Sequence, residues 1–540
     1  MDRHYDFIIV GGGSAGCVLA NRLSENANHQ VLLIESGPVD GGIYTKIPLG
    51  YGKTFYKSSI NWMYETEPIP TLNQRKNYWP RGRVLGGSSA INAMVYIRGH
   101  QSDFDSWASD VDSSWSHQNV LPYFKKSEDY CYGATEHHGS EGGMRVFDPS
   151  AEIHLLSKAF LGSCHALGYP LTPDFNGLQM EGCGPWQITT RNGLRESAAT
   201  AFLKPVLRRS NLTVLTNTQV KKILFKGRQA VGVRCINGAR EFSIKCGKEL
   251  ILSAGAVNTP KLLELSGIGD RNILLPLGIE MVLDSPMVGK NMQDHLALSC
   301  FFKSTIPTLN QSLGSIAGQM KAAVQYAFTR KGLLSMSVNQ VGAFVRSRDG
   351  LTSPNLQLYF NPISYDTAPA GNNRKVKPDR FPGFLISFNT CRPTSVGQVH
   401  IKDANYSTPP AINPNYISTT DDLRDVLDGY RIVRSIAGQQ PLSNFVAEHH
   451  FPTERELSDD DLMQDFRSRA STVYHPCSTA RMGKQVETSV LDGRLRVHGV
   501  GGLRVVDASA FPTITSGNIN APTIMLAEKA ADMIKEDWIK

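Results

Sequence analysis

Residues 5–35 read Y-D-F-I-I-V-G-G-G-S-A-G-C-V-L-A-N-R-L-S-E-N-A-N-H-Q-V-L-L-I-E, and this stretch decides the fold. The mostly apolar run at 5–10 predicts a strand, and the run V-L-L-I at 31–34 predicts a second one. Residues 14–23 lie between them and predict a helix. Strand, helix and strand in this order form a βαβ unit, which predicts an α/β fold built on a parallel sheet.

Three glycines mark the turn from the first strand into the helix. Gly11, Gly13 and Gly16 stand in G-x-G-x-x-G spacing. The first permits a tight turn, the second lets the backbone approach a pyrophosphate, and the third allows close helix–strand packing. Glu35 ends the second strand, where a carboxylate can accept both hydroxyls of an adenosine ribose. This order of elements predicts a dinucleotide site.

The predicted helix supplies the phosphate-binding end of that site. Ser14 and Ala15 open the helix, and the free N–H groups and dipole of a helix N-terminus favour an anion. Because NAD and FAD both use such a unit, these residues leave the choice of nucleotide open.

Two later stretches contain further glycine turns. In residues 82–105 (G-R-V-L-G-G-S-S-A-I-N-A-M-V-Y-I-R-G-H-Q-S-D-F-D), the small residues 86–89 suit either a surface loop or a backbone lying against a flat ring or diphosphate. Residues 255–269 (G-A-V-N-T-P-K-L-L-E-L-S-G-I-G) follow a predicted strand at 249–253. Thr259-Pro260 predicts a helix start there, since proline favours the first helical position.

Together, these two stretches resemble the signature patterns of the glucose–methanol–choline (GMC) oxidoreductases, a family of flavoenzymes. The resemblance covers nearly the whole chain and includes V-G-K-N-M-Q-D-H at 288–295. The run M-V-Y-I-R-G at 94–99 is most similar to the choline-dehydrogenase-like branch, which includes FAD-dependent alcohol dehydrogenases.

The resemblance implies FAD as the cofactor and adds binding residues to the glycine loop. These are Arg83, Gly86, Gly87, Ser88, Asn92, Ala93, Val95, Val220, Ala254, Gly255, Asp507, Ala508 and Asn518. Some members attach FAD covalently through a histidine after the double glycine. Ile91 and Asn92 occupy that region here, so we expect non-covalent FAD.

The resemblance also implies the catalytic residues. His475, in T-V-Y-H-P-C-S-T-A-R-M-G, falls on the family's catalytic histidine, and Pro476 biases it towards extended backbone. An imidazole is well suited to accept a hydroxyl proton near neutral pH. We assign the second catalytic position to Asn520, in S-G-N-I-N-A-P-T, with Asn518 as the nearby competitor. A helix predicted from Pro522 onwards would direct its positive end at the flavin.

The expected architecture is a Rossmann-like FAD domain interleaved with an α+β substrate domain on an antiparallel sheet. We expect residues 1–155, 213–300 and 485–540 in the FAD domain, and residues 156–212 and 301–484 in the substrate domain. Segments 212–226, 381–389, 397–401 and 502–507 read as strands, and a helix is expected over about 523–534.

Composition narrows the function class. The net charge of +7 is spread without a Lys/Arg block, so nucleic-acid binding is not expected. Nine scattered cysteines indicate reduced thiols and a cytoplasmic protein rather than a disulfide framework. We see neither a metal-ligand cluster nor an apolar run long enough to span a bilayer, but peripheral contact with the inner face of a membrane stays open.

The sequence therefore predicts FAD-dependent oxidation of an alcohol, with a primary alcohol preferred, by hydride transfer to flavin with His475 as the base. The electron acceptor could be a quinone, an electron-transfer protein or oxygen. Choline, sugar alcohols and sorbose remain alternative substrates. A redox-inactive lyase on the same scaffold and an NAD-dependent dehydrogenase are rival functions.

Overall fold

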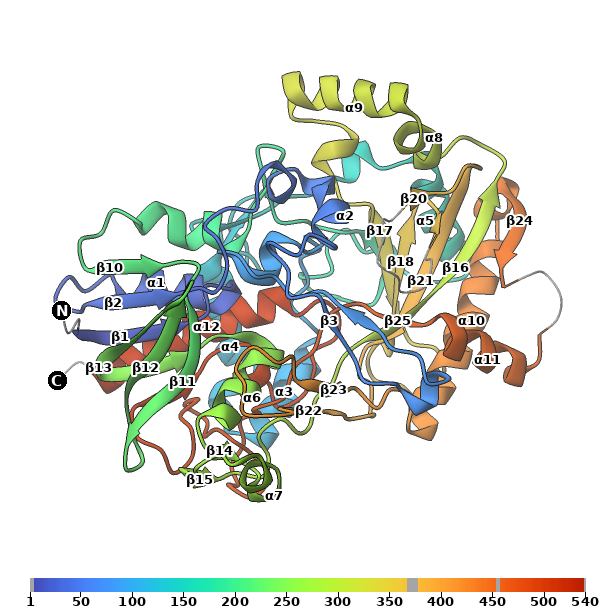
Figure 1. The fold of residues 1–540 in the computed structure, drawn as a ribbon. Helices are drawn as coiled ribbons and strands as arrows, with labels where there is room; N and C mark the ends of the chain where they lie inside the picture. Colours follow the sequence, from blue (N-terminus) through green and yellow to red (C-terminus); the bar gives the residue numbers. More distant parts are fainter. Residues whose placement is uncertain (1–3, 367–376, 453–456, 539–540) are drawn as a thin grey trace.

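Two large sheets organise the molecule in a computed structural model that describes residues 4–366, 377–452 and 457–538 (Figure 1). The first sheet has the strand order β10-β2-β1-β13-β12-β11, and β26 pairs with β13. Its strands are β1 (His4–Val10), β2 (Val31–Ile34), β10 (Leu212–Leu215), β11 (Gln219–Lys226), β12 (Gln229–Asn237), β13 (Arg240–Leu252) and β26 (Leu503–Val505). Strands β10, β2, β1, β13 and β26 are parallel, whereas β11 and β12 are antiparallel additions.

The predicted βαβ unit is confirmed. Helix α1 spans Ser14–Leu23 and β2 spans Val31–Ile34, as the sequence predicts. Strands β1 and β2 run parallel, with Phe7 opposite Val31. The predicted sheet segment 212–226 forms two strands, β10 and β11, at opposite edges of this sheet. An α/β fold with a largely parallel nucleotide-type sheet is therefore observed.

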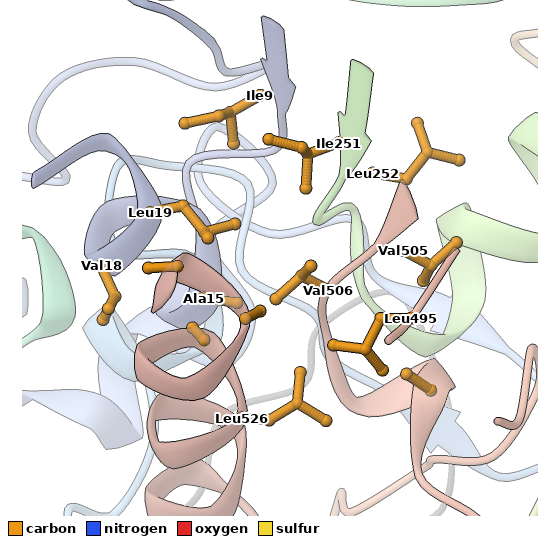
Figure 2. Packing of buried hydrophobic residues seen from close by; sticks show 14 of the residues in the cluster. Ile9, Ala15, Val18, Leu19, Ile251, Leu252, Leu495, Val505, Val506 and Leu526 are labelled. Carbon is orange, nitrogen blue, oxygen red and sulfur yellow. The ribbon is translucent and has the colours of Figure 1, made fainter. Parts of the chain in front are cut away.

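Helices α1 and α12 (Asn520–Asp537) pack side by side and run parallel. Ser14 Oγ donates to Asn520 Oδ1 (2.7 Å), and Arg22 Nε donates to Glu528 Oε2 (2.7 Å) two turns later. Both pairs are 506 residues apart in sequence, so the two helices are in register and begin at the same end. Figure 2 shows the apolar side chains buried around this contact: Ile9, Ala15, Val18, Leu19, Ile251, Leu252, Leu495, Val505, Val506 and Leu526.

Helix α6 begins earlier than predicted. The expected start was Thr259-Pro260, but α6 spans Gly255–Leu265 and carries Pro260 inside it. Proline has no N–H to donate to the carbonyl four residues before it, which here belongs to Ala256. Thr479 Oγ1 donates to that carbonyl instead (2.7 Å). A side chain distant in sequence thus supplies the missing donor, and the helix continues through the proline.

The second sheet is antiparallel and lies on the right of Figure 1. Its strands are β7 (Gly182–Pro185), β16 (Leu296–Ser304), β17 (Val341–Val345), β18 (Leu356–Asn361), β21 (Gly383–Thr390), β24 (Val446–Phe451) and β25 (Ser471–Thr472). Strand β21 confirms the predicted strand at 381–389. The prediction for 397–401 is wrong in its placement, because β22 (Gln398–His400) pairs with β23 (Ala411–Asn413) outside this sheet. Gly397 exchanges backbone hydrogen bonds with Met292, which directs this segment away from β21.

The chain passes between the two sheets more than once. The second sheet contains β7, β16, β17, β18, β21, β24 and β25, while β26 returns to the first. This exchange supports the interleaved division at 155, 212, 300 and 484, which we keep as a proposal. Strand β16 begins at Leu296, a few residues before the proposed boundary.

Helices cover the sheets and link them. They are α2 (Tyr51–Thr54), α3 (Gln101–Asp110), α4 (His117–Ser127), α5 (Leu155–Ala166), α7 (Arg271–Leu274), α8 (Leu309–Gly314), α9 (Ile316–Thr329), α10 (Thr420–Gly438) and α11 (Asp459–Arg469). Short ladders join β3 (Tyr64–Glu65) to β4 (Tyr78–Trp79), β5 (Glu128–Tyr130) to β6 (Met144–Val146), β8 (Thr190–Arg191) to β9 (Leu194–Arg195), β14 (Ile268–Gly269) to β15 (Leu283–Asp284) and β19 (Tyr365–Asp366) to β20 (Lys377–Pro378). The expected 502–507 strand is β26, and α12 extends the predicted 523–534 helix at both ends.

Candidate active site

One cavity of about 1080 Å³ extends from the carboxyl ends of the parallel strands to the second sheet. It brings most of the predicted site residues together. Those lining it are Gly11, Gly13, Ser14, Ala15, Glu35, Gly87, Ser88, Asn92, Ala93, Val95, Val220, Ala254, Gly255, His475, Asp507, Ala508, Asn518 and Asn520. Three predicted residues are outside the lining: Gly16, Arg83 and Gly86.

The glycine loop shapes the nucleotide end of the cavity. A Cβ atom at Gly11, whose φ is +107°, would lie 2.3 Å from the Ser253 carbonyl oxygen. A Cβ at Gly16 would lie 1.9 Å from the Gly11 carbonyl oxygen, so Gly16 acts through helix–strand packing. At Gly13 a Cβ would meet nothing closer than 4.0 Å and would project into the cavity. The loop therefore leaves a cradle open above the N-terminus of α1.

The double glycine closes over this loop. Gly86 N donates to the Gly12 carbonyl (2.7 Å), and a Cβ at Gly87 would lie 2.7 Å from Gly13 Cα. Both Gly86 and Gly87 have positive φ, at +92° and +53°. Arg83 lies behind them, with its guanidinium 5.5 Å from the Trp62 ring centroid. Gly86 and Arg83 thus support the loop from outside the cavity wall.

Glu35 lies at the end of β2 and is buried. Its two carboxylate oxygens accept from Gly12 N and Gly37 N, each at 2.8 Å. Burial raises the pKa of Glu35 to about 7, although these N–H donors and the Arg83 charge oppose the shift. A carboxylate has about four acceptor positions, so Glu35 can still accept from ribose hydroxyls.

The carboxylate of Asp507 is hydrogen-bonded to groups of the protein itself. Its oxygens accept four hydrogen bonds, from Gly255 N, Thr259 Oγ1 and both N and Oγ of Ser509. These donors occupy about all the acceptor positions of a carboxylate. Asp507 therefore ties the end of β26 to the start of α6, and this positions the neighbouring backbone at the cavity wall.

The catalytic end of the cavity contains a chain of hydrogen bonds through two imidazoles. His475 Nδ1 lies 3.0 Å from His295 Nδ1, and His295 Nε2 lies 2.8 Å from the Cys391 carbonyl oxygen. On the other side, Asn518 Nδ2 lies 3.1 Å from His475 Nε2, and Tyr359 OH donates to Asn518 Oδ1 (3.4 Å). These hydrogen bonds link the second sheet and the segment at His475 to the start of α12.

These contacts fix the tautomer of His475. The Cys391 carbonyl only accepts, so His295 Nε2 carries a proton and a neutral His295 offers an unprotonated Nδ1. His475 must then donate from Nδ1, which leaves its Nε2 unprotonated beside Asn518. Burial, with His295 and Arg81 adding to it, holds the pKa of His475 well below its ordinary value. The ring is therefore a neutral proton acceptor.

The backbone of His475 is held as firmly as its ring. Asp294 Oδ1 accepts from His475 N (2.7 Å), and its other oxygen accepts from Thr472 Oγ1 (2.6 Å) and from the Tyr416 hydroxyl. Residues 293–295 also exchange backbone hydrogen bonds with 473–477. Sequence reasoning missed Asp294 and His295 as site residues, although D-H closes the segment 288–295 that carried part of the family resemblance.

Asn518 and Asn520 do different things. Asn518 adjoins His475, whereas the Asn520 side chain accepts from Ser14 at the glycine loop. The pairing of His475 with Asn520 expected from sequence is therefore not the hydrogen bond that this structure contains. The asparagines are two positions apart, and the start of α12 directs them to different ends of the cavity.

Comparison with known proteins identifies the family. Residues 5–297 match the N-terminal profile of the GMC oxidoreductases, and residues 393–527 match the C-terminal one. The chain belongs to the GMC oxidoreductase family. It is an oxidoreductase that acts on CH–OH donors with FAD, as the sequence predicts.

Several GMC relatives cover almost the full length. The chain is 41% identical to an alcohol dehydrogenase [acceptor] of Pseudomonas putida over 98% of its own length and 95% of the relative's. It is 40% identical to the mitochondrial choline dehydrogenase of Mus musculus, over 98% and 89% of the two chains. Among solved structures, pyridoxine 4-oxidase from Mesorbium loti gives a TM-score of 0.88 at 30% identity, with 98% of both chains covered. Formate oxidase gives 0.91 at 26% identity, with 99% of both chains covered.

Three further findings concern metal groups, cysteines and membrane spans in the described residues. No group of His, Cys, Asp and Glu side chains there could hold a metal ion. All nine cysteines lie within the described part and are free thiols. In that same part, no helix combines the length and apolar character needed to cross a bilayer.

The cavity fits FAD at several points. The open cradle at Gly13 and the free N–H groups at the start of α1 suit the pyrophosphate, and Glu35 suits the adenosine ribose. The N-terminus of α12 faces the same cavity beside Asn518, where its positive end favours negative charge.

We expect Glu35→Ala to weaken FAD retention, because Glu35 is placed to accept from the ribose hydroxyls and orders the glycine loop through Gly12. Flavin absorbance per protein after dialysis measures this, and Glu487→Ala, at an exposed carboxylate, serves as the control. Full FAD occupancy in the dialysed Glu35→Ala protein would contradict the assignment.

Proposed function

We propose that this protein oxidises a neutral primary alcohol to the aldehyde. The supporting observation is the charge of the cavity. Among the described residues that line it, the only carboxylates are Glu35 and Asp507, and both lie in the nucleotide half. The other charged lining residues are basic: Arg75, Lys76, Arg81, Lys261, Lys377 and Arg469.

A cationic substrate such as choline would lack an anionic partner in this cavity. Burying an unpaired charge is costly, and basic neighbours increase that cost. Aromatic rings form much of the substrate half, including Phe55, Tyr56, Tyr78, Phe301 and Tyr474. Such rings contact an alkyl or aryl chain favourably. Because aromatic rings also attract a quaternary ammonium group, the preference for an uncharged, partly apolar alcohol over choline rests on the missing carboxylate and the basic residues.

The chemistry we propose rests on the His475–Asn518 pair. His475 Nε2 accepts the hydroxyl proton, because this nitrogen is unprotonated and held in the cavity wall. The substrate hydroxyl replaces the Asn518 N–H that Nε2 accepts here (3.1 Å). The Asn518 amide N–H donates to the same oxygen as negative charge develops on it. His295 and Asp294 keep the ring in one tautomer and one place. FAD, when bound, supplies the acceptor for the hydride that leaves the alcohol carbon.

We also propose that FAD is held without a covalent bond and is reoxidised by a quinone, an electron-transfer protein or oxygen. His475 is the one histidine among the described lining residues, and none of them is a cysteine. Asn92 lies near the position of the family's histidine linkage, and its Oδ1 accepts a hydrogen bond from the Arg195 guanidinium (2.8 Å).

Choline and 3,3-dimethyl-1-butanol test the substrate class directly, because they differ in charge but hardly in shape. We expect the neutral alcohol to reduce the bound flavin under anaerobic conditions with at least ~10-fold higher kcat/KM, a difference of ~1.4 kcal/mol. Benzyl alcohol and sorbitol extend the comparison to aryl and polyhydroxy substrates. Preference for choline would overturn the proposal, and preference for sorbitol would replace it with a sugar-alcohol dehydrogenase.

We expect His475→Ala to slow flavin reduction on the order of 100-fold or more, as loss of a general base does. Asn518→Ala should cost roughly 100- to 1000-fold, typical of a lost oxyanion donor. Asn520→Ala, compared at equal flavin content, is the matched control. It loses the Ser14 contact, but Arg22 and Glu528 still join α1 to α12, so stopped-flow reduction should stay within a few-fold of wild type. A larger defect in Asn520→Ala than in Asn518→Ala would restore the assignment made from sequence.

The rate of flavin reduction should be flat from about pH 6.5 upwards and fall at lower pH. The direction of this pH dependence follows from the lowered pKa of His475. The neutral imidazole is the active form, and it persists until the pH drops below that pKa. Stopped-flow reduction across pH 4.5–9 measures it, with the flavin spectrum as a check on integrity. A rate that still rises above pH 8 would contradict the assignment.

Acid precipitation should release all of the flavin into the supernatant, because the cavity offers no linkage of the histidine type next to Ile91 and Asn92. Yellow colour in the washed pellet would contradict non-covalent binding.

A further inference from the structure

Helix α9 (Ile316–Thr329) presents its apolar side to solvent. Ile316, Met320, Val324 and Phe328 recur every four residues and are 79%, 63%, 56% and 86% exposed. Figure 1 shows α9 at the outer rim of the molecule, away from both sheets. Large side chains exposed together in this way mark an interaction surface.

Unlike a normal surface helix, α9 turns its large apolar side chains towards solvent. At about 100° per residue, the four large side chains span roughly 120° of the helix, and the buried Ala322 and Tyr326 lie on the opposite side. Besides these four, the sector holds only Ala317 and Ala327, whereas Ala323 and Lys321 lie about 20° beyond its two edges. A surface helix ordinarily turns such a face towards the core. We define this outer sector as the α9 face.

The charges next to α9 in sequence are all positive. From 304 to 345 the only charged residues are Lys321, Arg330 and Lys331. Lys321 borders the face within the helix, and Arg330 and Lys331 follow it; all three are exposed. Glu152 accepts from Gly332 N (3.0 Å), beyond the C-terminal end of the helix.

We propose that the α9 face docks on the surface of an anionic lipid bilayer, with the helix lying in the interface. An apolar face bordered by cations is the pattern of interfacial helices. Fourteen residues extend only ~21 Å, less than the ~30 Å hydrocarbon core, so α9 lies on the membrane rather than across it.

A second copy of the chain fits the α9 face less well. The face is ~21 Å long and ~10 Å wide, a footprint of roughly 200 Å², against the ~800 Å² per partner of a standard protein interface. Two α9 faces brought together would also place Lys321 and its basic neighbours against each other. A negatively charged, apolar-cored surface satisfies both the side chains and the charge.

Docking would also place the cavity wall near the membrane. After α9 ends, the chain forms a short 3-10 turn at residues 333–335, which packs against both α9 and residues 48–50. It then reaches Val338 and Asn339, which line the cavity. An apolar alcohol or a lipid-soluble electron acceptor would then be available close to the site. The docking itself does not depend on either.

Vesicle flotation with the FAD-loaded protein tests the proposal. We expect binding to phosphatidylcholine vesicles containing phosphatidylglycerol and weaker binding to phosphatidylcholine alone. The double variant Met320→Gln/Phe328→Gln should bind at least ~10-fold more weakly, since each withdrawn side chain is worth more than the ~1.4 kcal/mol of a tenfold change. Leu178→Gln, at an 89% exposed leucine elsewhere, should bind like wild type. Lys321→Glu should weaken binding to the anionic vesicles.

Unchanged melting temperature, flavin content and dye-coupled activity in the α9 variants would show that only docking is affected. The proposal is overturned if wild type binds neither vesicle, or if the double variant binds as well as wild type. It is also overturned if sedimentation shows that the wild type is a dimer and the double variant a monomer, because a second copy would then occupy the face.

Discussion

The parallel packing of α1 on α12 is the constraint on which the site depends. Parallel helices place like ends of their dipoles together, which is unfavourable unless negative charge lies at the shared end. The hydrogen bonds between Ser14 and Asn520 and between Arg22 and Glu528 hold both helices in this arrangement. Their positive ends open on one cavity, so the fold itself favours an anionic dinucleotide there. The glycine loop provides the room, because any Cβ at Gly13 would enter the cradle.

The catalytic end depends on a second constraint, the alignment of residues 293–295 with 473–477. That pairing brings His295 to His475 and lets Asp294 accept from the His475 backbone. A buried imidazole can bind a proton at either nitrogen, and only its neighbours decide which one stays free. The Cys391 carbonyl accepts from His295 Nε2, so His295 accepts from His475 at Nδ1, and His475 Nε2 is left unprotonated at the cavity. Proton acceptance is thus organised by groups that do not touch the substrate.

Local sequence predicted the first third of the nucleotide sheet well, because its signals are short-range. Apolar runs, the glycine spacing and Glu35 lie within one βαβ unit, and α1 and β2 have the predicted bounds. The predicted start of α6 was wrong because Thr479, far along the chain, supplies the hydrogen-bond donor that Pro260 lacks. Strand β22 was misplaced because its partner is chosen by backbone contacts with Met292 and Ala411–Asn413, which have no local signal.

The sequence by itself determined the family, the dinucleotide loop and His475, since each of these is carried by adjacent residues in a recognisable order. Only the tertiary structure decided which asparagine lies beside His475. Asn518 and Asn520 have the same chemistry and differ by two positions, and the direction of each depends on how the chain enters α12. The tertiary structure also decided the role of His295 and the exposure of the α9 face. Both follow from which elements pack together, and residue spacing along one segment does not contain that information.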